Sequence, residues 1–222
     1  MSTPEPPIEL APWQTAAVDA VARTALSREI RFGGATALSA VHLHHRRSVD
    51  LDFFLPREVT QADALAMANA LSPMAERIEV RQLGPRWMIM LKDNGQETGH
   101  VDLTVRPFDA IEQPVKWRGL LVDSFTDMTV DKTQALLSRG RDRDFVDFLF
   151  LIEEGPLRDI DRLLSFVRAK FGLGFHRYTL AERLVTVAKV VDMPEMIRPL
   201  TLEELQVRLT ALARSILRGD AT

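Results

Sequence analysis

The sequence predicts an α+β fold, in which a mixed, mostly antiparallel sheet flanked by helices is followed by a helical region. Residues 1–124 carry the segments in which apolar and polar residues alternate, and glycine turns separate them. Residues 125–222 instead carry five stretches with the apolar spacing of helices. The 222 residues suffice to bury a sizeable core. We therefore expect an α/β core over residues 1–124 and a helical C-terminal region over residues 125–222.

The composition excludes several classes of protein. The net charge of -3 gives the whole chain no electrostatic reason to bind nucleic acid nonspecifically. The chain has no cysteine, so disulfides and thiolate metal sites are excluded. No run approaches the roughly 18 consecutive apolar residues of a membrane span, and residues 1–10 do not resemble a secretory signal. We expect a cytoplasmic protein that makes no contact with a membrane.

The elements of the first half follow from hydrophobic periodicity and turn residues. Pro4, Pro6, Pro7 and Pro12 predict an extended or disordered N-terminal segment. Helices are expected over 13–29, 36–43 and 61–71, and strands over 31–34, 49–55, 78–83, 87–91 and 99–105, with a short hairpin across 115–122. Residues 93–95, Asp-Asn-Gly, predict a hairpin turn because asparagine and glycine tolerate positive φ.

The second half is punctuated by Gly140, Gly155, Gly172 and Pro199. Helices are expected over 129–139, 142–153, 156–171, 180–190 and 202–217. In the last of these, a stripe at helical spacing predicts a face that packs on the core: Leu202, Leu205, Leu209, Leu212 and Ile216.

Two aspartates in one apolar strand need a physical reason, because aspartate is depleted in strands. In 49–55, Val49 belongs to the apolar face, while Asp50 and Asp52 share the other face with Cα atoms roughly 6.5–7 Å apart. Asp102 stands in the same relation to its own strand. If the two strands are adjacent, the three carboxylates can converge on one hard cation such as Mg²⁺. The alternative is a solvated sheet face with unrelated aspartates.

Gly33-Gly34-Ala35-Thr36 follows an expected strand and precedes an expected helix. Such a turn lets a phosphate approach the backbone closely. A glycine pair is also common in ordinary turns, so the pair alone does not indicate a phosphate site. Its position about 15 residues before the paired aspartates is what supports that interpretation.

Together these segments resemble the AbiEii/AbiGii-type nucleotidyltransferase toxins of the DNA polymerase β-like nucleotidyltransferase superfamily. The resemblance covers roughly residues 31–152. It rests on residues 33–38 (GGATAL), 45–54 (HRRSVDLDFF), 101–103 (VDL), 130–136 (VDKTQAL) and 141–147 (RDRDFVD). One departure is Ala35, which stands where the family commonly has the threonine of Gly-Gly-Thr, so the register of the glycines is open.

The resemblance implies a role for each matching residue. Asp50, Asp52 and Asp102 would bind Mg²⁺ and act in catalysis. The residues implied to bind nucleotide are Gly33, Gly34, Thr36, Ser48 and Lys132, with Lys132 at the phosphates. Asp144 would be the catalytic acid borne by a helix, and the helical C-terminal region would complete the active site. Helix capping explains an acid at position 144 equally well, and a solvated surface lysine explains position 132.

The resemblance further implies transfer of a nucleoside monophosphate from an NTP to an acceptor. RNA, including tRNA, is a candidate acceptor by analogy, and a separately encoded antitoxin is the expected partner of a toxin–antitoxin or phage-defence system. Two other functions use the same residues. A regulatory module would bind nucleotide without transferring it, and a metal-dependent phosphodiesterase would use the same acids to shorten RNA.

Overall fold

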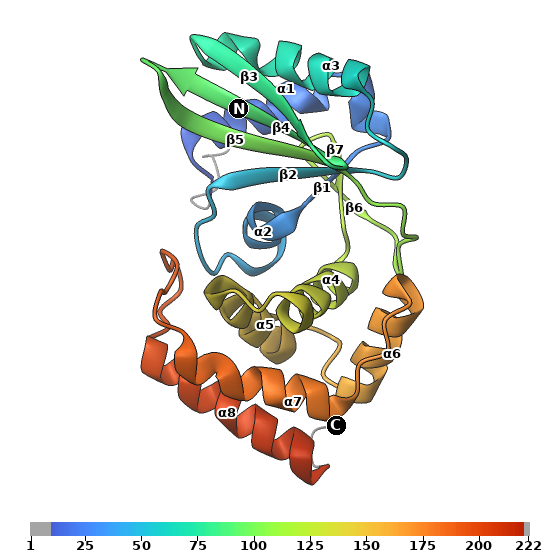
Figure 1. Cartoon of the computed structure of the whole chain (residues 1–222), viewed down its shortest axis with the longest axis vertical. Helices are drawn as coiled ribbons and strands as arrows, with labels where there is room; N and C mark the ends of the chain where they lie inside the picture. Colours follow the sequence, from blue (N-terminus) through green and yellow to red (C-terminus); the bar gives the residue numbers. More distant parts are fainter. Residues whose placement is uncertain (1–9, 220–222) are drawn as a thin grey trace, which may run out of the picture. The chain divides into compact units, whose positions relative to one another are not determined.

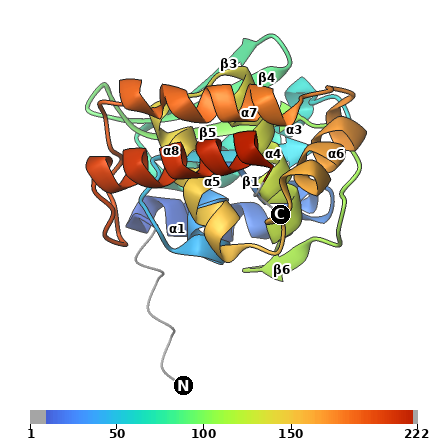
Figure 2. The same cartoon turned by 90° about the horizontal axis from the view of Figure 1, so that it is seen from below.

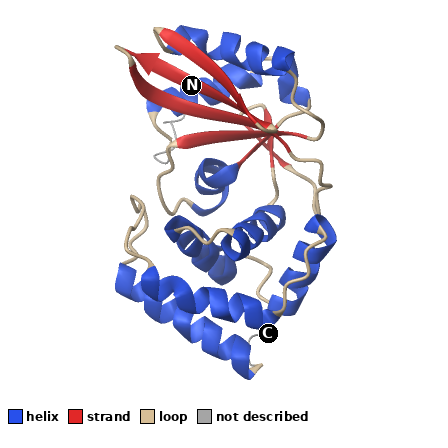
Figure 3. Ribbon diagram, in the orientation of Figure 1, coloured by secondary structure: helices blue, strands red, loops and turns tan. Residues whose placement is uncertain are grey.

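The computed structural model describes residues 10–219, so Pro4, Pro6 and Pro7 of the segment expected to be extended or disordered lie outside the described residues. Pro12 was assigned to that segment wrongly, because it is the first residue of a helix, where a missing N–H costs nothing. The chain divides into two compact units. The first takes the chain through Phe108 together with Pro114–Asp123, and the second takes Asp109–Gln113 and the chain from Ser124 onward. Every described strand belongs to the first unit, and the second is built of helices (Figure 3). No helix within residues 10–219 is long and apolar enough to cross a membrane.

The first unit is a seven-stranded mixed sheet in the order β3-β4-β5-β2-β1-β7-β6. Its strands are β1 (Arg31–Gly33), β2 (Asp50–Leu55), β3 (Arg77–Leu83), β4 (Arg86–Asp93), β5 (Gln96–Val105), β6 (Val115–Trp117) and β7 (Leu120–Val122). The β2–β5 and β1–β7 pairs are parallel, and the other pairs are antiparallel. The predicted α+β class and the mostly antiparallel sheet are both confirmed.

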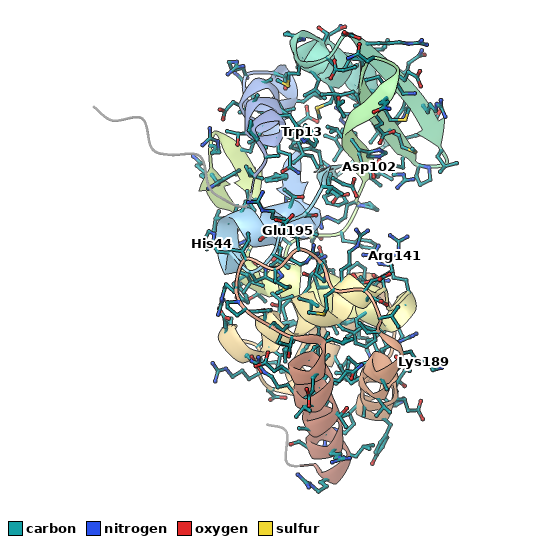
Figure 4. All side chains as sticks on the ribbon, turned by 90° about the vertical axis from the view of Figure 1, so that its left-hand side faces the viewer. Trp13, His44, Asp102, Arg141, Lys189 and Glu195 are labelled. Carbon is teal, nitrogen blue, oxygen red and sulfur yellow. The ribbon has the colours of Figure 1, made fainter. Side chains whose placement is uncertain are left out.

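Helices cover the two faces of this sheet. Figure 1 shows α1 (Pro12–Ala22) and α3 (Gln61–Leu71) on one face and the short α2 (Gly34–Ala37) on the other. The face beneath α1 and α3 is apolar, because alternate residues of the central strands point there and are fully buried: Leu51, Phe53, Val101 and Leu103. Trp13 of α1 lies against Gly99 of β5, where a Cβ atom would come within 3.0 Å of the indole ring (Figure 4).

The two predicted hairpin turns are confirmed. Asn94 and Gly95 have φ angles of 51° and 76°, and Arg118 and Gly119 have φ angles of 48° and 81°. Positive φ at both central residues is the type I′ geometry, whose twist matches that of the paired strands.

Several predicted boundaries were wrong for local reasons. The helix expected over 36–43 begins at Gly34, and its part from Leu38 to Leu43 is a π-helix, η2. That helix ends at His44, which is left-handed with φ 52°. Val49 lies before β2 and is 70% exposed, so it does not belong to the apolar face. The helix expected over 13–29 stops at Ala22, and a separate 3-10 turn, η1, follows at Ala25–Arg28.

The second unit contains five α-helices within the described residues. They are α4 (Phe125–Ser138), α5 (Asp142–Glu154), α6 (Ile160–Phe171), α7 (Arg177–Val185) and α8 (Leu202–Arg218). Helix α6 starts later than expected because Asp159 caps it, its carboxylate accepting the N–H of Arg162 at 3.0 Å. Helices α7 and α8 pack side by side (Figure 2). The predicted packing stripe of α8 is confirmed at Leu205, Leu209 and Ile216, which are fully buried.

A buried carboxylate organises the start of α4. Asp127 is fully buried, and it accepts the N–H groups of Ile111 and Glu112 at 3.0 Å each. The ammonium of Lys170 on α6 lies 2.8 Å from the same carboxylate. Burial by itself would raise the pKa of Asp127, but Lys170 and the two N–H groups together hold that pKa below its ordinary value. Asp127 therefore joins the 109–113 segment, α4 and α6.

We expect Asp127→Asn to lower the free energy of unfolding by about 2–4 kcal/mol at neutral pH, because it removes one partner of a buried ion pair. A depressed folded-state pKa gives stability that is present above the unfolded pKa of about 3.9 and is lost as the pH falls through the folded value. Urea unfolding measured from pH 7 downward should therefore show a difference from wild type that is constant above about pH 5 and shrinks below about pH 4.

Asp131→Asn is the matched control, since Asp131 is the second carboxylate beside Lys170, at 2.7 Å, and its side chain is 21% exposed. Its loss of stability should be the smaller of the two. An equal loss in both variants would contradict the assigned role of Asp127.

Candidate active site on the sheet

The three predicted acids lie on two adjacent strands of the sheet. In the parallel β2–β5 pair, Asp52 stands directly opposite Asp102, and Asp50 stands opposite His100. All four residues point to the face opposite the apolar one, because their strand neighbours are fully buried on the other side. The expected adjacency of the two strands is confirmed, and Asp102 projects from β5 in Figure 4. We refer to this surface, defined by Asp50, Asp52, His100 and Asp102, as the acid face.

The glycine turn borders the same face. Gly33 is the last residue of β1 and pairs with Asp52 in the antiparallel β1–β2 register. Gly34 has φ 69°, and a Cβ atom on it would lie 1.9 Å from Oδ2 of Asp52. A Cβ atom on Gly33 would lie 2.6 Å from the ring of Phe54. Both positions therefore need glycine, and the missing Cβ atoms leave the backbone of the turn directly beside the carboxylate of Asp52.

Thr36 and Ser48 secure the backbone around the acids. The hydroxyl of Thr36 is buried and donates a hydrogen bond to the backbone carbonyl of Asp50. Ser48 precedes β2, and its carbonyl accepts the side-chain amide of Gln14 at 2.9 Å. The Thr36 contact fixes the turn to the first residue of β2, and the Ser48 contact joins the residue before β2 to α1. The predicted contacts of both residues with nucleotide stay predictions.

Two cationic side chains hold Asp102. Arg86 donates to its Oδ2 at 3.2 Å, and Nε2 of His100 lies 3.0 Å from its Oδ1. Nδ1 of His100 lies 3.1 Å from Oε1 of Glu97. Because each ring nitrogen faces a carboxylate, which only accepts hydrogen bonds, His100 donates from both and carries a positive charge. The hydrogen bond to Asp102 raises the pKa of His100 to about 9, and Glu97 adds to this against the opposing effect of burial.

Sequence reasoning missed both partners of Asp102. His100 could have been found, because a spacing of two puts residues 100 and 102 on one face of a strand. Arg86 could not, since it reaches Asp102 only through the register of the β4–β5 hairpin, in which Met88 pairs with Asp102.

The acids have the chemistry of a site for a hard cation, although their oxygens do not all converge. Asp50 and Asp52 supply carboxylate oxygens from one strand face, and Gly34 leaves room beside Asp52. Within residues 10–219, however, no group of three or more Asp, Glu, His or Cys side chains is close enough to hold a metal ion. The expectation that all three acids meet at one point is therefore not met, because the oxygens of Asp102 are directed to Arg86 and His100.

The remaining predicted site residues belong to the second unit. Lys132 of α4 is buried, and its Nζ lies 2.6 Å from Oδ2 of the fully buried Asp147 of α5. Asp144 accepts two hydrogen bonds from the guanidinium of Arg139 and one from the N–H of Arg141, each 3.0 Å long. Asp144 thus caps α5 in this structure, and the acid that contacts Lys132 is Asp147, one turn further along. The sequence placed both acids in the first turns of a helix and did not separate their roles.

Solved structures of other proteins share the fold of this chain. JHP933 from Helicobacter pylori has a similar structure, with a TM-score of 0.60 and 18% identity, covering 94% of this chain and 90% of that one. MenT4, a nucleotidyltransferase toxin from Mycobacterium tuberculosis H37Rv, gives a TM-score of 0.53 and 14% identity, covering 94% of this chain and 85% of that one. At these identities the likeness is one of fold. No curated protein matches the chain.

The family match extends over almost the whole chain. Residues 17–222 match the family described as Nucleotidyl transferase AbiEii toxin, Type IV TA system. This range includes the glycine turn, the three acids of the sheet and the Lys132–Asp147 pair. The chain is a nucleotidyltransferase and belongs to the AbiEii toxin family.

Proposed function

We propose that this protein transfers a nucleoside monophosphate from an NTP to an acceptor in a reaction that depends on Mg²⁺ and releases pyrophosphate. One observation carries the proposal. Asp52 stands between Gly33 on one neighbouring strand and Asp102 on the other, with Asp50 two residues away on the same face. Carboxylates for a cation and a backbone turn for a phosphate are thus adjacent, as transfer of a phosphoryl-linked group requires.

In this proposal Asp50 and Asp52 hold the cation. Bound there, Mg²⁺ would neutralise charge on the triphosphate and help to align it for in-line attack. Gly33 and Gly34 admit a phosphate to within contact of the backbone, since neither position carries a Cβ atom. Asp102 serves the attacking hydroxyl of the acceptor, either as a further ligand or by accepting its proton.

Lys132 supplies a positive charge for the phosphates. Its ammonium is a compact charge with three donors, which suits a phosphate oxygen. Asp147 pairs with it in a buried position, and this ion pair occupies one of its three donors. Asp144 remains the proposed acid borne by a helix, and its carboxylate accepts three hydrogen bonds, from Arg139 and from the N–H of Arg141.

The biological role proposed is that of the toxin in a toxin–antitoxin or phage-defence system. The family description, which names a toxin of a Type IV TA system, supports it. A separately encoded antitoxin is then the expected partner, the cytoplasm the expected site of action, and RNA, including tRNA, the proposed acceptor.

Incubation with each of the four α-labelled NTPs, Mg²⁺ and total RNA tests the reaction. We expect label from one preferred NTP to become covalently attached to RNA without shortening it. Saturable nucleotide binding without transfer would contradict the proposal and favour a regulatory module, and shortened RNA would favour a phosphodiesterase. The same reaction without RNA, with added protein as acceptor, shows whether the acceptor is RNA.

A further inference from the structure

Glu97 reaches the acid face because β5 contains a bulge. Lys92 of β4 pairs with Glu97 while the preceding Leu91 pairs with Gly99, so Thr98 is an extra residue in β5. In a regular strand, residues 97 and 100 would point to opposite faces, because their spacing is odd. The extra residue brings Glu97 onto the same face as His100. Bulges of this kind re-aim side chains beside functional sites.

Thr98 is anchored on the turn side of the hairpin. Its hydroxyl donates to Oδ2 of Asp93 at 2.8 Å. The bulge therefore has a local contact of its own, and it places Glu97 on the face where its Oε1 lies 3.1 Å from Nδ1 of His100.

The result is a chain of alternating charges that ends at Asp102. Oε1 of Glu97 lies within hydrogen-bond distance of Nδ1 of His100, and Nε2 of His100 lies within hydrogen-bond distance of Oδ1 of Asp102. The guanidinium of Arg86 donates to Oδ2 of Asp102. The side chains of His100 and Asp102 are 19% and 11% exposed, so solvent screens this contact only partly. Both oxygens of the third acid are thus occupied by positively charged donors.

We propose that Arg86 and the Glu97–His100 pair form a latch, which occupies both carboxylate oxygens of Asp102 until a divalent cation with its nucleotide recruits that carboxylate. This inference rests on the proposed function, since it assumes that the cation binds at Asp50 and Asp52. Arg86, Glu97 and His100 are then positioning residues, which act on the reaction through Asp102.

The contacts of Asp102 indicate that its neighbours compete with a metal ion rather than support Asp102 as a metal ligand. A group that supports a metal ligand from outside usually strengthens binding, and its removal weakens metal affinity by about 10–100-fold. Here Arg86 and His100 occupy the two oxygens of Asp102 that a divalent ion would need, so they compete with it for the same carboxylate, and the guanidinium of Arg86 also repels it.

The test is the affinity of the full-length protein for Mn²⁺ in the absence of nucleotide, measured from the electron paramagnetic resonance signal of free Mn²⁺. We expect His100→Gln and Arg86→Gln each to tighten Mn²⁺ binding by about tenfold, because each removes a donor that occupies one oxygen of Asp102. In an Asp102→Asn background, the same two substitutions should change the affinity by less than about twofold, since the carboxylate that they release is then absent.

Arg81→Gln is the matched control. Arg81 lies on β3, pairs with Met88 on the same face and makes an exposed ion pair with Glu79 at 3.0 Å. Its loss removes the same charge from the same hairpin without touching Asp102, and salt screens its effect, so the Mn²⁺ affinity should stay within about twofold of wild type.

Each alternative result has a separate meaning. Unchanged or weaker Mn²⁺ binding in both His100→Gln and Arg86→Gln, with binding still lost in Asp52→Asn, would overturn the latch and leave the cation site standing. Mn²⁺ binding that is absent from wild type, or indifferent to Asp52→Asn, would refute the cation site itself and the latch with it. Tighter binding that persists in the Asp102→Asn background would also overturn the latch, because the effect would then not pass through Asp102.

Discussion

Asp52→Asn is expected to reduce nucleotide transfer by about 10³-fold or more. Asp52 lies beside the glycine turn on one side and opposite Asp102 on the other, so it is adjacent both to the proposed phosphate site and to the third acid. Loss of its charge removes a cation ligand, which is worth several kcal/mol in the transition state, and each 1.36 kcal/mol changes the rate tenfold. The measurement is the initial rate of label transfer at a saturating concentration of the preferred NTP.

Glu79→Gln is the control for loss of a carboxylate from the same sheet face. Glu79 pairs with Met90 on β4, and its partners are Lys92 at 3.1 Å and Arg81 at 3.0 Å. Its loss should leave the transfer rate within about twofold of wild type, because pairs of this kind contribute little. Asn is nearly isosteric with Asp, so Asp52→Asn should unfold at the same urea concentration as wild type. Transfer at the wild-type rate by Asp52→Asn would remove the basis of the proposed reaction.

Local signals carried most of the fold prediction. The alternation in β2 and β5 identified which residues share a face, and the helix of residues 61–71 was predicted with its observed bounds, Gln61–Leu71. Thr60 explains that accuracy, because its hydroxyl accepts the N–H of Asp63 at 3.2 Å and marks the start of the helix in the sequence. The Asn94-Gly95 turn was equally readable, since few residues other than glycine and asparagine adopt positive φ.

The errors arose where tertiary contacts override local preference. The π-helix of Leu38–Leu43 has no signature in the spacing of its apolar residues, and Val49 alternates correctly although it lies outside the strand. The bulge at Thr98 is of the same kind, because a strand with an extra residue shows the same alternation over most of its length. The contacts of Arg86 with Asp102 and of Glu97 with His100 depend on that register, so alternation could not predict them. Only the approach of His100 to Asp102 follows from a spacing of two.

The same distinction between local patterns and tertiary contacts applies to the residues of the candidate site. Residues within one strand, such as Asp50 and Asp52, follow from a spacing of two, and their opposition to Asp102 needed only one further assumption about strand order. The choice between Asp144 and Asp147 depended instead on which carboxylate each neighbouring cation reaches. Arg139 forms an ion pair with Asp144, and Lys132 forms an ion pair with Asp147. Such partners are set by side-chain packing between helices, which a motif does not encode.

Gly34→Ala is expected to affect both the fold and the reaction. A left-handed backbone costs an alanine about 1–2 kcal/mol. The new Cβ atom would also lie 1.9 Å from Oδ2 and 2.8 Å from Cβ of Asp52, and the latter atom is fixed by the strand backbone. The turn and β2 must therefore separate, which adds about 1–3 kcal/mol, as for other overpacked sites. Because the separation moves Asp52 relative to the turn, transfer should fall by about 10²-fold or more.

Gly84→Ala separates the two causes. Gly84 has φ 59°, and a Cβ atom on it would meet nothing within 4 Å, so this variant has the backbone strain of Gly34→Ala without the collision. Urea unfolding should place Gly84→Ala about 1–2 kcal/mol below wild type and Gly34→Ala lower still, and the transfer rate of Gly84→Ala should be unchanged. If the two variants lost equal stability and Gly34→Ala kept its activity, the contact between the glycine turn and Asp52 would have no part in the reaction. The glycine pair would then be an ordinary turn, and the phosphate site would have to lie elsewhere.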